Sequence, residues 1–223
     1  MGTALSISGL ALAALALAQY PPSADANSSV EVRLELRKSA EWQPVESTAV
    51  FNTNDEIRFR FRTSFPGYLY VLNRASNGET DWLYPQPDQG QTSRVEPGPD
   101  YLIPGTRGSF VVGGTPGFDL TYWVVSPSPI DTRSSAMPEP ASQPSTLIPR
   151  CREQVLKARG LCVDERAGPR PLSTPDQLPP ELRRPAQLAA RDLKFRAESG
   201  QTRISAKVSP TGVIVYEFRI AHR

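Results

Sequence analysis

The segment Val30-Glu-Val-Arg-Leu-Glu-Leu36 alternates strictly between apolar and charged residues. In an extended chain successive side chains point to opposite faces, so its four apolar side chains share one face and its charged ones share the other. Such alternation is typical of a β-strand with one face in a hydrophobic core and one face in water. The segment therefore predicts a fold built from half-buried strands.

The segment Ile57-Arg-Phe-Arg-Phe-Arg62 repeats this alternation with larger apolar side chains. Its charged face is a basic stripe of Arg58, Arg60 and Arg62. Such a stripe is either a solvated face that discourages edge-to-edge pairing of sheets, or a patch for an acidic partner or a surface glycan.

More short strands follow at the spacing of hairpins, with turn residues and no helix between them. The pair Asn77-Gly78 favours a tight hairpin. We expect these strands over residues 68–72, 82–84, 101–103, 110–112 and 120–125. Short strands joined in this way predict an all-β protein, an antiparallel β-sandwich of immunoglobulin-like type.

The sandwich domain is expected to span residues 29–127. A Pro-rich linker with one short Cys-containing helix should follow over 128–190. The C-terminal part, 191–223, should return to strands, with segments at 192–197, 203–208 and 213–220. Because two strands alone are only marginally stable in water, we expect this C-terminal β-hairpin to dock on the sandwich and complete it.

Residues 7–18 form an almost unbroken apolar run. The run is too short to cross a bilayer, which needs about 20 residues, but it suits a secretory signal peptide. We expect residues 1–18 to be removed by cleavage between Ala18 and Gln19, with Ala24-Asp25-Ala26 as a second cleavage site. No Lys or Arg precedes the run, so an uncleaved N-terminal anchor is the alternative.

Cleavage would leave an exported chain, periplasmic or extracellular, with no transmembrane span. Residues 19–28 are polar and contain proline, and we expect them to form a disordered lead.

Cys151 and Cys162 fit export to an oxidising compartment. On one straight helix they would lie about 16 Å apart along the axis, whereas a disulfide requires Cα atoms within about 7 Å. A disulfide therefore requires the helix expected over 152–159 to end near Gly160, which can adopt a positive φ. The alternative is a pair of unpaired thiols on a mobile segment.

The formal net charge of +2 gives no argument for binding to nucleic acid or to an anionic membrane. A structural zinc site takes four ligands, mainly Cys and His, and the chain has 2 Cys and 1 His. We therefore predict no metal site and no cofactor.

A set of landmarks occurs in order between Phe51 and Pro127. They are Phe51-Asn-Thr-Asn-Asp-Glu-Ile-Arg-Phe-Arg-Phe61, Gly67-Tyr-Leu-Tyr-Val-Leu72, Asn77-Gly78, Leu83-Tyr-Pro85, Tyr101-Leu-Ile-Pro104 and Pro116-Gly117. This segment resembles the bacterial domain of unknown function 4384, and residues 215–223 resemble the tail of stand-alone exported members. In one departure, Asn54-Asp55 stands where Gly-Asp is commoner. The resemblance implies a β-sandwich module of envelope proteins and no catalytic residues.

Catalytic chemistry has few candidates in this sequence. A nucleophile activated by histidine needs a rigidly held base, and His222, the single histidine, is next to the last residue, where chains usually fray. Glu79 and Asp81 flank the Asn77-Gly78 turn and would be the acid and base of a hydrolytic enzyme of unknown type. Carboxylates at such turns are ordinarily solvated, so this is the alternative hypothesis.

Aromatic residues are the stronger binding candidates. Tyr68 and Tyr70 share one face of their strand, and Trp82 lies on the strand beyond the turn. They either fill the core or, when exposed together, form a platform for a ligand. We therefore expect an exported, non-enzymatic module whose partner is a protein or glycan of the cell envelope, bound by these strands or by the loop 86–99.

Overall fold

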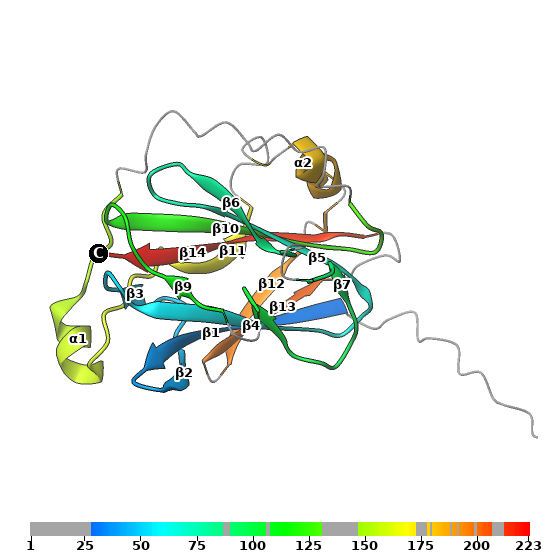
Figure 1. Cartoon of the computed structure of the whole chain (residues 1–223). Helices are drawn as coiled ribbons and strands as arrows, with labels where there is room; N and C mark the ends of the chain where they lie inside the picture. The colour runs from blue at the N-terminus through cyan, green and yellow to red at the C-terminus, as the bar shows by residue number, and fades with distance from the viewer. Residues whose placement is uncertain are drawn as a thin grey trace, which may run out of the picture.

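The computed structural model describes residues 28–86, 90–105, 108–130, 147–172, 178, 180–187, 189–190, 192–198, 200–206 and 212–223. Two seven-stranded sheets face each other as the layers of a sandwich (Figure 1). The two helices are short, and one lies at an end of the sandwich and the other over one sheet. The all-β sandwich predicted from strand alternation is therefore confirmed.

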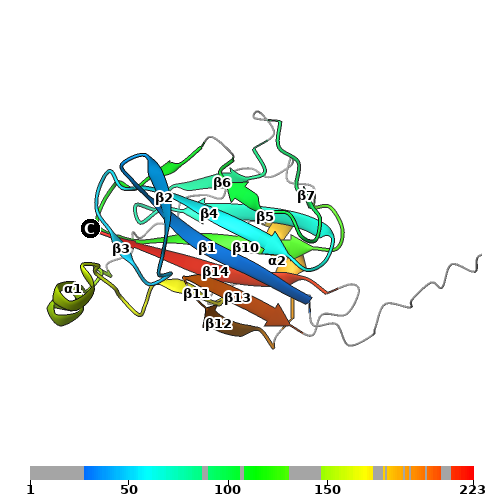
Figure 2. The same ribbon diagram turned by 90° about the horizontal axis from the view of Figure 1, so that it is seen from below.

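The first layer, which we call the β1 sheet, is the one viewed in Figure 2. Its strands are β1 (Ser28–Lys38), β2 (Glu41–Val45), β4 (Glu56–Thr63), β8 (Tyr101–Ile103), β9 (Phe110–Val111), β12 (Lys194–Glu198) and β13 (Gln201–Ala206). They lie in the order β12-β13-β1-β4-β8, with β2 also paired to β1 and β9 to β4. All of these pairings are antiparallel.

We call the second layer the β10 sheet. Its strands are β3 (Val50–Phe51), β5 (Gly67–Arg74), β6 (Thr80–Tyr84), β7 (Arg94–Val95), β10 (Gly117–Ser126), β11 (Gly168–Pro171) and β14 (Ile214–His222). The order is β11-β14-β10-β5-β6, with β3 paired to β14 and β7 to β5. The pair β3–β14 is parallel, and the others are antiparallel.

Large aromatic side chains fill the space between the layers. Trp123 of β10 is fully buried and lies edge-on to Phe59 of β4, with ring centroids 5.1 Å apart. It also stacks on Phe61 at 5.9 Å and on Tyr216 of β14 at 5.7 Å. The apolar faces predicted for residues 30–36 and 57–61 thus meet the second layer through this cluster.

The C-terminal strands divide between the two sheets. β12 and β13 form a hairpin that extends the β1 sheet, with Val30 of β1 opposite Ile204 of β13. β14 instead lies inside the β10 sheet, where it pairs with both β10 and β11. The predicted docking of the C-terminal segment on the sandwich is therefore present, and the segment supplies strands to both layers.

The cysteine segment forms the expected short helix. α1 (Glu153–Arg159) ends at Gly160, whose φ of 65° is in the left-handed region. Because the chain turns back there, Cys151 and Cys162 approach to a Cα–Cα distance of 5.2 Å and form a disulfide. The backbone N–H of Val50 donates to the carbonyl of Cys162 at 2.9 Å, which ties this loop to the end of the sandwich.

The segment expected to be a linker also contributes structure where it is described. β11 forms an edge of the β10 sheet. The proline-rich sequence does not predict α2 (Pro180–Gln187), although proline suits the first position of a helix. Leu178 and Leu182 are fully buried against the outer face of the β10 sheet.

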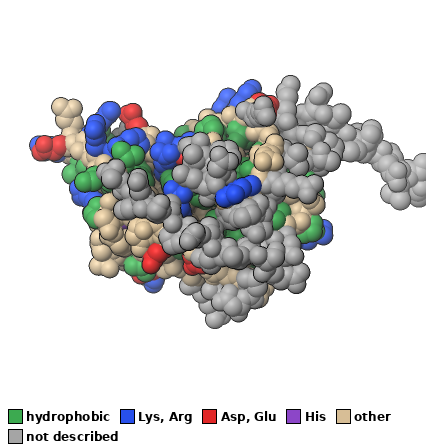
Figure 3. Space-filling view, turned by 90° about the horizontal axis from the view of Figure 1, so that it is seen from above, with side chains coloured by type: hydrophobic (Ala, Val, Ile, Leu, Met, Phe, Trp, Pro, Cys, Tyr) green, Lys and Arg blue, Asp and Glu red, His purple; other side chains and the backbone are tan. Residues whose placement is uncertain are grey.

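Figure 3 views the molecule from the side of this outer face. Among the side chains drawn in colour, hydrophobic ones reach the surface in small areas between charged and other residues. No helix in the described part of the chain is long and apolar enough to cross a membrane. The signal peptide predicted for residues 1–18, its cleavage position and most of the lead at 19–28 lie outside the described residues.

Substituting Trp123→Ala should lower the free energy of unfolding by about 3–5 kcal/mol, because it leaves a cavity between the layers and removes contacts with three rings. Urea unfolding followed by circular dichroism measures the change. Val111→Ala is the control: this side chain is 64% exposed, so we expect a change within about 0.5 kcal/mol. A loss below about 1 kcal/mol for Trp123→Ala would contradict this account of the core.

Replacing both cysteines with serine should lower the free energy of unfolding by about 3 kcal/mol, since the unfolded chain loses a closed loop. Thermal unfolding with and without dithiothreitol measures the effect. Reductant should destabilise the natural chain and leave the double variant unchanged. Equal stability of the natural chain with and without reductant would show that the disulfide does not constrain it.

Candidate functional site

The outer face of the β1 sheet carries paired rows of charged side chains. The register places Glu31 opposite Arg62, Arg33 opposite Arg60, and Glu35 opposite Arg58. These residues alternate with the apolar residues of the core, so their side chains point away from the second layer. Cross-strand neighbours on one face lie close enough to interact, so this face is a network of charges.

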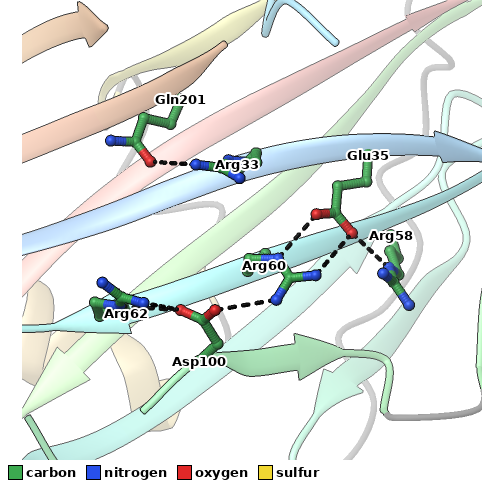
Figure 4. A network of polar contacts seen from close by, with 7 residues as sticks. All are labelled: Arg33, Glu35, Arg58, Arg60, Arg62, Asp100 and Gln201. Atoms are coloured by element: carbon green, nitrogen blue, oxygen red, sulfur yellow. Dashed lines mark hydrogen bonds and ion pairs between the residues drawn. The ribbon is translucent and has the colours of Figure 1, made fainter. Parts of the chain in front are cut away.

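Glu35 is the centre of this network, and only 4% of the residue is exposed. Arg58 Nε donates to Glu35 Oε2 at 2.6 Å, and Arg60 Nε donates to Oε1 at 2.8 Å (Figure 4). One carboxylate is therefore shared by two neighbouring arginines on β4. Arg58 is also enclosed, because its guanidinium lies over the ring of Trp42 at 4.3 Å.

Asp100, in the turn before β8, forms the second junction. Arg60 Nη1 donates to Asp100 Oδ2 at 3.0 Å, and Arg62 Nε donates to Oδ1 at 3.0 Å. Arg60 thus bridges the two carboxylates, as Figure 4 shows. The side chain of Arg62 remains 50% exposed and that of Arg60 30%.

Arg33 differs from the other arginines of this face. Its Nη2 donates to Gln201 Oε1 at 3.0 Å, and among the described residues it forms no ion pair. Its Nε is enclosed and has no hydrogen-bond partner there. Because Arg33 lies directly opposite Arg60, two like charges face each other at this point of the sheet.

The arginines change the acidity of the two carboxyl groups. Burial alone would raise the pKa of Glu35, but hydrogen bonds and charges from Arg60 and Arg58 outweigh it and hold the pKa below its usual value. The same holds for Asp100: burial raises its pKa, but hydrogen bonds and charges from Arg60 and Arg62 outweigh burial and hold the pKa below its usual value. Both groups are therefore carboxylates at neutral pH, and the network consists of full charges.

A cavity of about 140 Å³ lies beside this network. Its walls come from β1, β4, β13 and the turn before β8: Glu31, Arg33, Arg60, Phe61, Arg62, Asp100 and Gln201. The polar groups of the wall are hydrogen-bond donors on the arginines and acceptors on the carboxylates. Such a surface can hold a small polar or anionic group.

The aromatic residues predicted as a platform lie on the other layer. Tyr70 is 2% exposed, and its hydroxyl accepts from the backbone N–H of Ile130 at 2.7 Å. Tyr68 and Trp82 are half-buried and pack against the same hydrophobic cluster as Tyr70 and α2. The structure thus brings the three residues to one sheet face, which the chain itself partly covers, and their role in binding stays a prediction.

The carboxylates of the alternative hypothesis lie at a hairpin. Glu79 is exposed and accepts from Asn77 Nδ2 at 2.8 Å. Asp81 is also exposed and pairs across the strands with Asn73. They lie on the β5–β6 hairpin of the second layer, whereas the cavity is on the outer face of the β1 sheet.

His222 does not lie in a frayed end, contrary to the expectation from its position in the sequence. It is the last residue of β14, is 1% exposed and pairs with Gly117. Its Nε2 lies 3.2 Å from Asp119 Oδ1, which also accepts from the backbone N–H of Ser76 at 2.7 Å. The side-chain hydroxyl of Ser76 donates to the carbonyl of Thr115, so these residues tie loops to the sheet.

The basic stripe is predictable from the sequence, but Arg33, Glu35, Asp100 and Gln201 are not among the predicted site residues. The two β1 residues had a signal, since they alternate with apolar positions as the arginines of β4 do. No sequence signal marks Asp100 or Gln201, because they come from distant segments that strand pairing brings to this face.

Residues 50–129 match the family model described as Domain of unknown function (DUF4384). This confirms the resemblance drawn for the segment from Phe51 to Pro127. No curated protein and no solved structure matches the chain. The matched segment contains the arginines of β4 and Asp100, whereas Arg33, Glu35 and Gln201 lie outside it.

Substituting Glu35→Gln should lower the free energy of unfolding at pH 7 by about 2–4 kcal/mol, because it leaves Arg58 and Arg60 without their shared charge partner. The pKa of Glu35 is lowered in the fold, so its contribution is present above the unfolded pKa near 4.5 and is lost as pH falls through the lower folded value. The variant and the natural chain should therefore converge in stability under acid conditions. Urea unfolding at a series of pH values measures both effects.

Arg62→Gln is the matched control for this prediction, because its side chain is half exposed and it shares Asp100 with Arg60. We expect it to change the free energy of unfolding by less than about 1 kcal/mol. A Glu35→Gln variant as stable as the natural chain at pH 7 would show that the network does not stabilise the fold.

Proposed function

We propose that this chain, whose residues 50–129 match the domain of unknown function, is an exported, non-enzymatic binding module of the bacterial cell envelope. Its contact surface is the arginine-rich outer face of the β1 sheet. The component that it binds or supports presents acidic groups to this face. The basic stripe is then a patch for an acidic partner or surface glycan, and not only a solvated face.

The cavity beside Arg33, Arg60 and Arg62 is the observation that carries this proposal. Arginine presents several donors in a fixed plane and suits carboxylate groups. Arg60 is held by two carboxylates, so little conformational freedom is lost when a partner binds to it. Arg62 is half exposed and extends the same surface to solvent.

Export is supported by two independent features. The apolar run at residues 7–18 has the length of the apolar core of a signal peptide. The disulfide between Cys151 and Cys162 suits an oxidising compartment, such as the periplasm or the cell exterior.

A retention assay with paired extracts tests the proposal. The chain is expressed from Met1 and purified in whatever form the expression host produces, cleaved or uncleaved. It is then immobilised and incubated with envelope extract or with cytosolic extract of the producing bacterium. We expect a component of the envelope extract to be retained, and Arg62→Gln to reduce its amount at least about threefold through loss of an exposed charge on the contact face. Quantitative mass spectrometry measures the retained material.

Arg94→Gln is the control variant. Arg94 lies on β7 of the other layer, its side chain is 65% exposed, and it pairs with Glu96 at 2.7 Å. It should retain as much of the envelope component as the natural chain. Equal losses in both variants would place the contact surface elsewhere, and retention from the cytosolic extract alone would contradict a role in the envelope.

A further inference from the structure

Arg33 forms no ion pair within the described fold. The three arginines of β4 each share a carboxylate: Arg58 and Arg60 share Glu35, and Arg60 and Arg62 share Asp100. Arg33 contacts the neutral amide of Gln201 instead. An arginine opposite another arginine, with an enclosed and unpartnered Nε, gives the fold little stability.

The cavity wall has a small excess of positive charge. It contains three guanidinium groups, those of Arg33, Arg60 and Arg62, and two carboxylates, those of Glu31 and Asp100. Glu31 also accepts from Arg203 at 2.5 Å, outside the wall. A ligand with one negative charge would balance this wall, whereas a dianion such as a phosphate monoester would leave one negative charge in excess beside the two carboxylates.

The same wall offers acceptors for neutral hydroxyl groups. Ionised carboxylates such as Glu31 and Asp100 accept hydrogen bonds and donate none. A ligand that combines one carboxylate with several neighbouring hydroxyl groups would use the donors and the acceptors of the wall together. An acidic amino-acid side chain has the carboxylate but no hydroxyl groups around it.

We propose that this cavity binds the carboxylate and adjoining hydroxyl groups of a uronic acid unit in a glycan, with Arg33 as the main charge partner. This inference rests on the proposed function and names the chemistry of the component bound at the same face. Arg33 and Arg62 bind the sugar carboxylate, and Asp100 and Glu31 accept from its ring hydroxyls. The small volume, about 140 Å³, limits recognition to one sugar unit at a time.

Isothermal titration of the full chain with trigalacturonate tests this inference. The methyl ester of the same trisaccharide is the neutral control, and triglutamate is the acidic peptide control. We expect the natural chain to bind trigalacturonate at least about tenfold more tightly than either control, because only this probe has both carboxylates and ring hydroxyls. Arg33→Gln should weaken this binding at least about tenfold.

Two further variants test whether binding of trigalacturonate depends on this face of the protein. Arg62→Gln changes an exposed side chain and should also weaken the binding of trigalacturonate, whereas Arg94→Gln should leave it unchanged. Urea unfolding of Arg33→Gln should match that of the natural chain, since Arg33 has no carboxylate partner among the described residues.

Equal affinity for the ester, tighter binding of triglutamate or of inorganic phosphate, or no effect of Arg33→Gln would each overturn the inference. The retention assay distinguishes this failure from a failure of the proposed function. If an envelope component is retained through Arg62 but trigalacturonate does not bind, the proposed contact face is supported and the uronic acid as its ligand is rejected.

Discussion

The packing of Trp123 between the two layers is the contact on which the rest of the structure depends. Its ring meets Phe59 and Phe61 of one sheet and stacks on Tyr216 in its own sheet. In the strands that carry these rings, every second side chain points into the core between the sheets. The charged residues between them therefore point to the outer faces. The network of arginines and carboxylates on the outer face of the β1 sheet follows from this alternation.

The charged side chains on the outer face of the β1 sheet differ in their partners. Glu35 is enclosed and satisfies Arg58 and Arg60 together, so this end stabilises the sheet. Arg33 faces Arg60 with only an amide as its partner. A charge that contributes little to the fold, beside a cavity with other arginines, is the physical basis for placing recognition here.

The family segment does not form either sheet alone. Residues 50–129 include β4 and β10, whose neighbours β1 and β14 come from outside the match. The cavity is divided in the same way, with Arg60, Arg62 and Asp100 inside the segment and Arg33 and Gln201 outside it. The family match therefore describes part of the sandwich, and the flanking segments complete both the core and the candidate site.

The sequence by itself determined most of the strands, the end of α1 and the shared face of the three arginines on β4, because alternation and a glycine at a helix end are local signals. It gave no signal for the short strands β2, β3, β7 and β11. It could not assign β14 to the opposite layer from β12 and β13, nor place Asp100 and Gln201 beside the stripe. Those features depend on strand partners and register, which are decided by packing between residues far apart in the chain. Only the tertiary structure therefore showed that the three arginines of the stripe share two carboxylates. It also showed that Arg33, on another strand, lies beside them without an ion pair among the described residues.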